Sequence, residues 1–75
     1  MSSFQKWLSK KLIKAEMSQI ELSRRSGLSH FTINSWLKKS KKPRLSTLSK
    51  VIQVLAEALN ESYDDLLDEV LNELV

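Results

Sequence analysis

Residues 19–44 read QIELSRRSGLSHFTINSWLKKSKKPR, and this stretch decides the fold. It contains the chain's single glycine, Gly27, and its single proline, Pro43. Apolar residues stand on both sides of the glycine at helical spacing, so the stretch predicts two short helices joined by a tight turn. A run of basic residues follows the second helix and ends at the proline.

Each part of this stretch has a physical role in bringing the two helices together. Leu22 is placed to point inward, and the small Ser23 after it lets the next helix approach closely. Gly27 ends the first helix because glycine adopts the left-handed conformation of a helix stop without strain. Ser29 is the expected N-cap of the second helix, since its hydroxyl can accept a hydrogen bond from a first-turn amide. The layout predicts a helix-turn-helix.

The second helix of this motif has two different faces. Ile33, Trp36 and Leu37 fall three and four positions apart, so their face is expected to be buried. The opposite face is mostly polar and is suited to meet base edges in a major groove. It consists of Ser29, His30, Phe31, Asn34, Ser35 and Lys38.

The stretch resembles the phage repressor and Cro family of helix-turn-helix proteins, also called the XRE or Cro/C1-type family. The resemblance covers residues 8–67, and the joint order and spacing of its short motifs make it specific. The matching residues are Ser18-Gln19, Leu22, Gly27-Leu28-Ser29, Thr32-Ile33, Trp36, Pro43, Leu45, Thr47-Leu48, Leu55 and the segment SYDDLL at residues 62–67. This resemblance implies an all-α bundle that binds double-stranded DNA and regulates transcription.

The polar helix face and the resemblance together give a set of expected DNA contacts. We expect base contacts from Ser29, His30, Phe31, Asn34 and Ser35. Contacts to the DNA backbone are expected from both motif helices and the basic loop, and the resemblance implies Arg44 as the minor-groove candidate. The expected backbone contacts are Ser18, Gln19, Thr32, Lys38, Lys41, Lys42 and Arg44.

Two of these residues have a plainer alternative. His30 can be an idle surface residue; without a second histidine or any cysteine, we expect no metal site, no cofactor and no catalytic role for it. Phe31 has no core to enter at the exposed start of the helix, so it can press against a thymine methyl group. The alternative is that its ring folds back onto Leu28 or the loop.

The sequence departs from the family pattern at two places. The family often pairs an arginine, seven residues before the glutamine, with a glutamate just after the Trp36 position; here those places hold Leu12 and Leu37. A buried ion pair can be replaced by packed apolar residues without loss of stability, so the fold prediction stands and the two leucines are expected to touch. The family also often has glycine where Lys39 stands.

Helical spacing continues along the rest of the chain, and no segment alternates like a strand. We therefore expect one all-α domain over residues 1–75, a compact five-helix bundle of the phage-repressor type in which helices two and three form the motif. The expected helices are residues 3–15, 18–26, 29–39, 45–59 and 62–75. Their main inward stripes are Phe4, Leu8, Leu12 and Ala15 in the first helix and Leu48, Val51, Ile52, Leu55 and Leu59 in the fourth.

Composition narrows the class of protein further. The 75 residues suffice for one domain with a small core. The absence of cysteine excludes disulfides and fits a reducing cytoplasm. The sequence has no apolar run of membrane-span length and no signal-peptide core at its start, so we expect a cytoplasmic protein that enters no membrane. The acids cluster on the last two expected helices among apolar residues at helical spacing, without a catalytic base, a nucleophile or a glycine-rich loop near them, so an enzyme is not expected.

The net charge of +3 hides a strong polarity along the chain. Residues 1–44 contain eleven Lys or Arg and two acids, whereas residues 45–75 contain one lysine and seven acids. A basic front half fits a protein that presents one face to a polyanion. Charge runs also serve simply as solvated faces, so the polarity supports DNA binding only together with the motif.

The last expected helix carries a wider apolar stripe than one small core needs. Its apolar residues are Leu66, Leu67, Val70, Leu71, Leu74 and Val75. We expect the surplus to form a homodimer interface made by Leu67, Val70, Leu71 and Leu74. The alternative is that the stripe only caps the bundle, with Leu66, Val70 and Leu74 turned inward.

The expected function is sequence-specific binding of double-stranded DNA by a dimeric regulator, in the first place a repressor, on an inverted-repeat operator. The alternative is a protein-interaction module that uses the same fold, such as the antitoxin partner of a toxin, whose partner the sequence does not identify.

Overall fold

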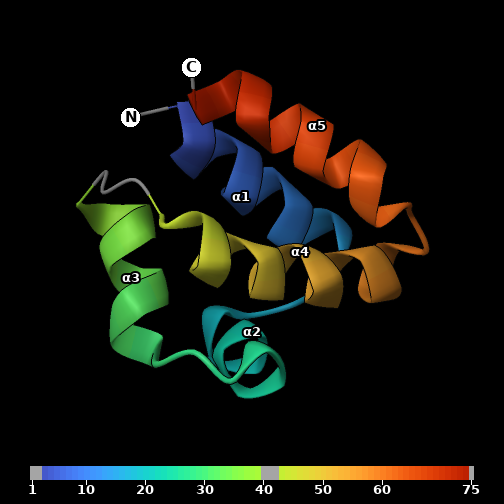
Figure 1. The fold of residues 1–75 in the computed structure, drawn as a ribbon. Coiled ribbons are helices and arrows are strands. Elements are labelled where there is room, and N and C mark those ends of the chain that lie inside the picture. The colour runs from blue at the N-terminus through green and yellow to red at the C-terminus, as the bar shows by residue number, and fades with distance from the viewer. Residues whose placement is uncertain (1–2, 40–42, 75) are drawn as a thin grey trace.

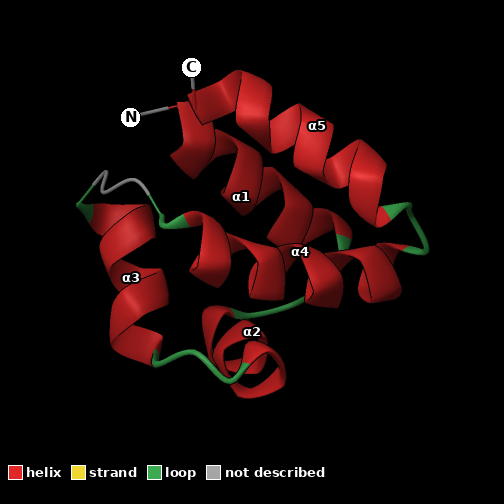
Figure 2. Ribbon diagram, in the orientation of Figure 1, coloured by secondary structure: helices red, strands yellow, loops and turns green. Residues whose placement is uncertain are grey.

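The computed structural model describes residues 3–39 and 43–74, and within these residues it contains five helices and no strand (Figures 1 and 2). The all-α prediction is confirmed, and the described boundaries differ from the expected ones by at most one residue. The helices are α1 (Ser3–Lys14), α2 (Gln19–Ser26), α3 (His30–Lys38), α4 (Leu45–Leu59) and α5 (Tyr63–Leu74).

Helix α4 lies across the middle of the bundle, between α5 on one side and α2 on the other (Figure 1). Helix α1 packs against α4, α5 and α3, so it connects α4 and α5 to the motif helix α3. Helix α3 stands at one end of the molecule, where it packs against α1 and α2. This arrangement leaves one long side of α3 without a covering helix.

A single apolar core joins all five helices. It confirms the inward stripes expected for α1 and α4, and both tryptophans belong to it. Leu12 lies within the core and Leu37 packs against it as a partly buried residue, so the two family ion-pair positions are both in apolar surroundings. The buried apolar residues are Phe4, Trp7, Leu8, Leu12, Met17, Leu22, Ile33, Trp36, Leu48, Val51, Ile52, Leu55, Leu66 and Val70.

Three helices end on a residue in the left-handed conformation. These residues are Glu16 after α1 (φ 54°), Gly27 after α2 (φ 76°) and Asn60 after α4 (φ 54°). Glycine and asparagine tolerate this conformation, whereas glutamate has no intrinsic preference for it. At the end of α1 the amide of Met17 donates to the carbonyl of Leu12 over 2.9 Å, which closes the helix and brings the Met17 side chain into the core.

Helix α5 turns one part of its apolar stripe inward. Leu66 and Val70 are fully buried, Leu67 is half-buried and Leu71 is 41% exposed. Val70 was expected in the dimer interface, but it lies in the core of the single chain because it shares the inner face of the helix with Leu66. The side chain of Leu74 lies outside the described residues.

Charged side chains of α1, of α5 and of the loop before α5 form a small network. The Nζ of Lys11 lies 3.0 Å from the carboxylate of Glu69, and the indole Nε1 of Trp7 donates to the same carboxylate over 3.1 Å. Lys14 pairs with Glu61 over 3.2 Å. The hydrogen bond from Lys11, helped by that from Trp7, holds the pKa of Glu69 below its ordinary value despite partial burial.

Replacing Gly27 by alanine tests the left-handed stop between the motif helices. Gly27→Ala should lower the free energy of unfolding by about 1–2 kcal/mol, because an L side chain is strained at this φ. An added Cβ would meet no atom within 4 Å, so a steric clash does not contribute to the expected loss of stability. Gly27→Asn, the control, should lose less because asparagine tolerates the conformation. Urea titrations in which both variants match the parent would contradict the argument.

Replacing Glu69 by glutamine tests the network between α1 and α5. Because the pKa of Glu69 is lowered on folding, its carboxylate stabilises the fold fully above the unfolded pKa of about 4.3, and this contribution is lost as the pH falls through the lower folded pKa. Glu69→Gln should therefore melt below the parent near pH 7, and the difference should close in acid. Asp68→Asn, at an exposed neighbour, is the control. A difference that widens on acidification would refute this role.

Candidate nucleic-acid interface

The turn between α2 and α3 is held by side-chain hydroxyls as well as by its glycine. Ser23 Oγ donates to the carbonyl of Leu28 over 2.6 Å. The amide of Leu28 donates to Ser26 Oγ over 3.3 Å. Ser23 therefore does more than leave room for the next helix, because it fixes the chain at the point where α3 begins.

Both motif helices begin directly after a serine that caps them. Ser18 Oγ accepts a hydrogen bond from the amide of Glu21, and Ser29 Oγ accepts one from the amide of Thr32, each over 3.1 Å. The Ser29 and Thr32 hydroxyls also lie 2.9 Å apart. The cap expected at Ser29 is therefore confirmed, the structure adds a second cap at Ser18, and both serines lie on the protein surface.

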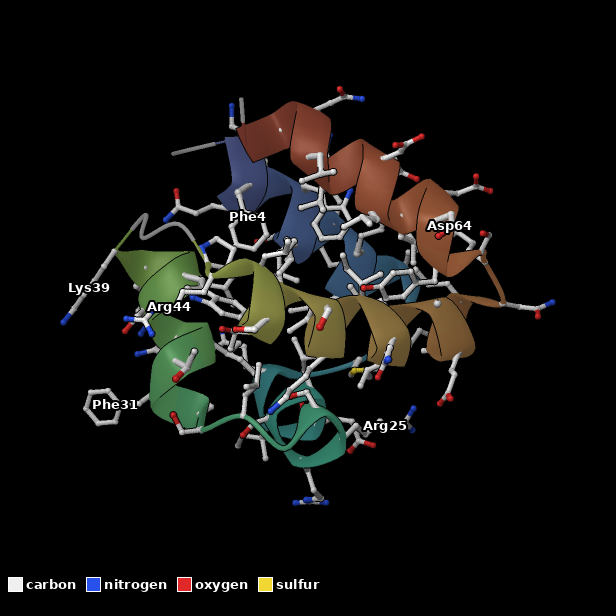
Figure 3. The ribbon with its side chains drawn as sticks, in the orientation of Figure 1. Phe4, Arg25, Phe31, Lys39, Arg44 and Asp64 are labelled. Carbon is white, nitrogen blue, oxygen red and sulfur yellow. The ribbon has the colours of Figure 1, made fainter. Side chains whose placement is uncertain are left out.

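Helix α3 has one buried face and one surface face, as the spacing of its apolar residues predicted. Ile33 is fully buried and Trp36 is 4% exposed. On the other face Phe31 is 81% exposed and points away from the body of the molecule (Figure 3). The alternative in which this ring folds back onto Leu28 or the loop is therefore wrong. The other expected base contacts also reach the surface, with Ser29 and His30 exposed and Asn34 and Ser35 half-buried.

The expected phosphate contacts divide into those that the structure places and those that it does not describe. Lys38 and Arg44 are exposed, and Gln19 and Thr32 are half-buried. In Figure 3 Arg44 lies on the same side of the molecule as Phe31. The expected contacts Lys41 and Lys42 lie outside the described residues.

Lys39 joins this surface although it was not among the expected contacts. Its side chain is exposed and extends from the end of α3, on the side of Phe31 and Arg44 (Figure 3). The signal in the sequence was its place in the lysine run before Pro43. Its φ of −108° suits any L residue, so this chain does not need the glycine that the family often has here.

Acidic side chains gather on a different part of the molecule. Asp64, at the start of α5, lies on the opposite side from Phe31 in Figure 3. The other exposed acids of α5 are Asp65, Asp68 and Glu73. Within the motif, Glu21 of α2 forms an ion pair with Arg25 over 2.9 Å. The α3 surface is thus free to approach a polyanion with little repulsion from the acidic helix.

Within the described residues, no group of three or more His, Cys, Asp or Glu side chains is arranged to hold a metal ion. None of the described helices combines the length and apolar character that crossing a membrane requires.

One buried polar residue close to α3 was not singled out by sequence reasoning. Gln5 is 3% exposed, and its Nε2 donates to the carbonyl oxygen of Leu37 over 3.0 Å. In the sequence, Gln5 stands beside the apolar stripe of α1, and this position predicts a side chain on the surface. Only the packing of α1 against the end of α3 turns it inward.

Comparison with known proteins agrees with this geometry. A family model described as a Cro/C1-type HTH DNA-binding domain matches residues 7–70, a range that includes both motif helices. Searches of curated proteins and of solved structures gave no match. The family match confirms the resemblance that the motif residues carry.

Phe31→Ala and Lys38→Ala should separate sequence reading from general attraction to DNA. Phe31→Ala should change the preference at one or two operator positions by about 1–3 kcal/mol, because an apolar ring reads a base edge. Lys38→Ala should weaken binding to all sequences alike, since a lysine on phosphate carries no sequence information. Affinities for single-base operator variants measure both effects. Equal losses of Phe31→Ala on cognate and random duplexes would mean that Phe31 reads no base.

Proposed function

The chain belongs to the Cro/C1-type helix-turn-helix DNA-binding domain family, and we propose that it is a transcription regulator, most simply a repressor, that reads its operator as a homodimer. The observation that carries this proposal is the division of α3, whose inner face is locked in the core while Phe31 and its neighbours stand at the surface. A helix held rigidly in this way can enter a major groove as a recognition helix.

In this proposal α3 reads base edges while the residues around it bind phosphate. His30, Phe31 and Ser35 supply polar and apolar contacts to the bases. The ammonium groups at the end of α3 and the guanidinium of Arg44 bind the flanking backbone. Regulation is then a matter of occupancy in the cytoplasm, since a protein that covers the operator blocks polymerase there.

The dimer part of the proposal rests on the outer side of α5. Leu71 is 41% exposed and Leu67, one turn earlier, is half-buried, so the two form a short apolar strip. Asp68 and Glu73 are exposed on the same helix and would lie at the rim, where water screens their repulsion. A two-fold pairing through this strip that sets the two α3 helices about 34 Å apart would fit an inverted repeat.

Binding to random duplex DNA at low salt tests the proposal against the alternative of a pure protein-interaction module. If a dimer makes about 6–10 phosphate contacts, affinity should fall by roughly 10³–10⁵ between 50 and 200 mM salt, because each contact releases counterions. Fluorescence anisotropy of a labelled duplex measures this directly, and selection from random duplexes then supplies the operator. No binding, or a flat salt profile, would favour the interaction module.

Sedimentation of the parent, Leu71→Glu and Asn72→Glu tests the dimer. Leu71→Glu should shift the mass toward the monomer and weaken binding to a palindromic operator, because it buries a charge in the proposed strip. Asn72→Glu adds the same charge at the next, exposed position and should behave like the parent. A parent that stays monomeric at high micromolar concentration, and binds a half-site as well as a palindrome, would reduce α5 to a cap of the bundle.

A further inference from the structure

The C-terminal end of α3 is held from outside its own helix by a side chain of α1. Leu37 belongs to the last turn of α3, where carbonyls have no partner further along the helix. Its oxygen accepts the 3.0 Å hydrogen bond from Gln5 Nε2. The donor stands 32 residues earlier in the chain, so this bond reports the tertiary position of α3 and not its local sequence.

The residues around this bond are packed and aromatic. Phe4, next to Gln5, stacks on Trp7 with ring centroids 6.1 Å apart. The same ring meets Trp36 edge-on at 5.9 Å. Phe4 is 2% exposed, Gln5 is 3% exposed and Leu37 is half-buried, so the contact between the first turn of α1 and the last turn of α3 is largely shielded from solvent. A hydrogen bond in such surroundings is strong and directional.

The position of this contact matters because α3 is short. Its nine residues span about 13 Å, and its first turn is already held by the Ser29 cap and the Ser23 hydroxyl. A tilt of about 10° around that first turn would move the last turn by roughly 2 Å. Such a shift is larger than the range of a good hydrogen bond to a base edge, whereas flexible lysines can still reach phosphate.

We propose that Gln5 is a positioning residue for DNA reading, in which its amide group fixes the tilt of α3 while the residue itself touches no DNA. The inference rests on the function proposed above. It adds that sequence specificity depends on a buried glutamine of α1. It also adds that this dependence on Gln5 increases along α3 toward its C-terminal end. Bases read by Ser35, near the end that Gln5 holds, should depend on Gln5 more than bases read by Phe31, near the end that Ser29 caps.

The test compares Gln5→Leu and Gln5→Met, which keep a similar volume but remove the donor, with Gln53→Leu at an exposed glutamine of α4. Affinities for the selected operator and for a random duplex of equal length are measured at one salt concentration. We expect the operator-to-random ratio to fall by about tenfold for both Gln5 variants, comparable to one lost base contact, and to stay unchanged for Gln53→Leu. The lost preference should lie at the positions that Ser35→Ala affects.

The ratio separates positioning from a merely structural role. A variant that only loses folded fraction binds both duplexes more weakly by the same factor, so its ratio stays at the parent value. An unchanged ratio for both Gln5 variants would therefore overturn the inference while leaving the proposed function intact. A parent that selects no operator would instead refute the proposed function, and the selection step reports this before any variant is compared.

Discussion

A helix of nine residues is not stable alone in water, so α3 exists as a helix only because one of its faces is buried. Ile33 and Trp36 supply that face, and they pack into the same core as the apolar residues of the other four helices. The burial that makes α3 fold also decides which side of it stays at the surface. Stability and DNA reading therefore depend on one set of contacts, and a change that loosens Trp36 should weaken both.

Apolar packing and polar contacts contribute differently to this arrangement. Packing of Trp36 against Phe4 provides cohesion but tolerates small sliding movements, since dispersion has little directional preference. Two hydrogen bonds flank α3, one from Ser23 to Leu28 in the turn before it and one from Gln5 to Leu37 in its last turn, and such bonds weaken steeply with distance and angle. The core thus keeps α3 in place, and the polar contacts define its orientation.

The sequence predicts features that act over a few residues and misses those set by distant packing. Periodicity, together with Gly27 and Ser29, was enough to give the helices, their bounds to within one residue, and the stop and N-cap at the motif turn. Glu16 adopts a left-handed conformation without any intrinsic preference, because the turn after α1 must deliver Met17 to the core. Periodicity also gives the width of the α5 stripe but not the part that faces inward, which is why Val70 was expected at an interface and is found in the core.

Packing also changes how much of the basic charge in the first half of the chain is available to attract DNA. Two of the basic residues in the first half are paired: Lys11 with Glu69 of α5, and Lys14 with Glu61 of the loop before α5. Their charge is balanced within the bundle and adds little to the attraction of DNA. The basic residues that remain near α3 are fewer than the sequence count suggests, but Lys38, Lys39 and Arg44 are all exposed there. The same pairing ties α1 to α5, so part of the basic charge of the front half stabilises the scaffold that holds the reading helix.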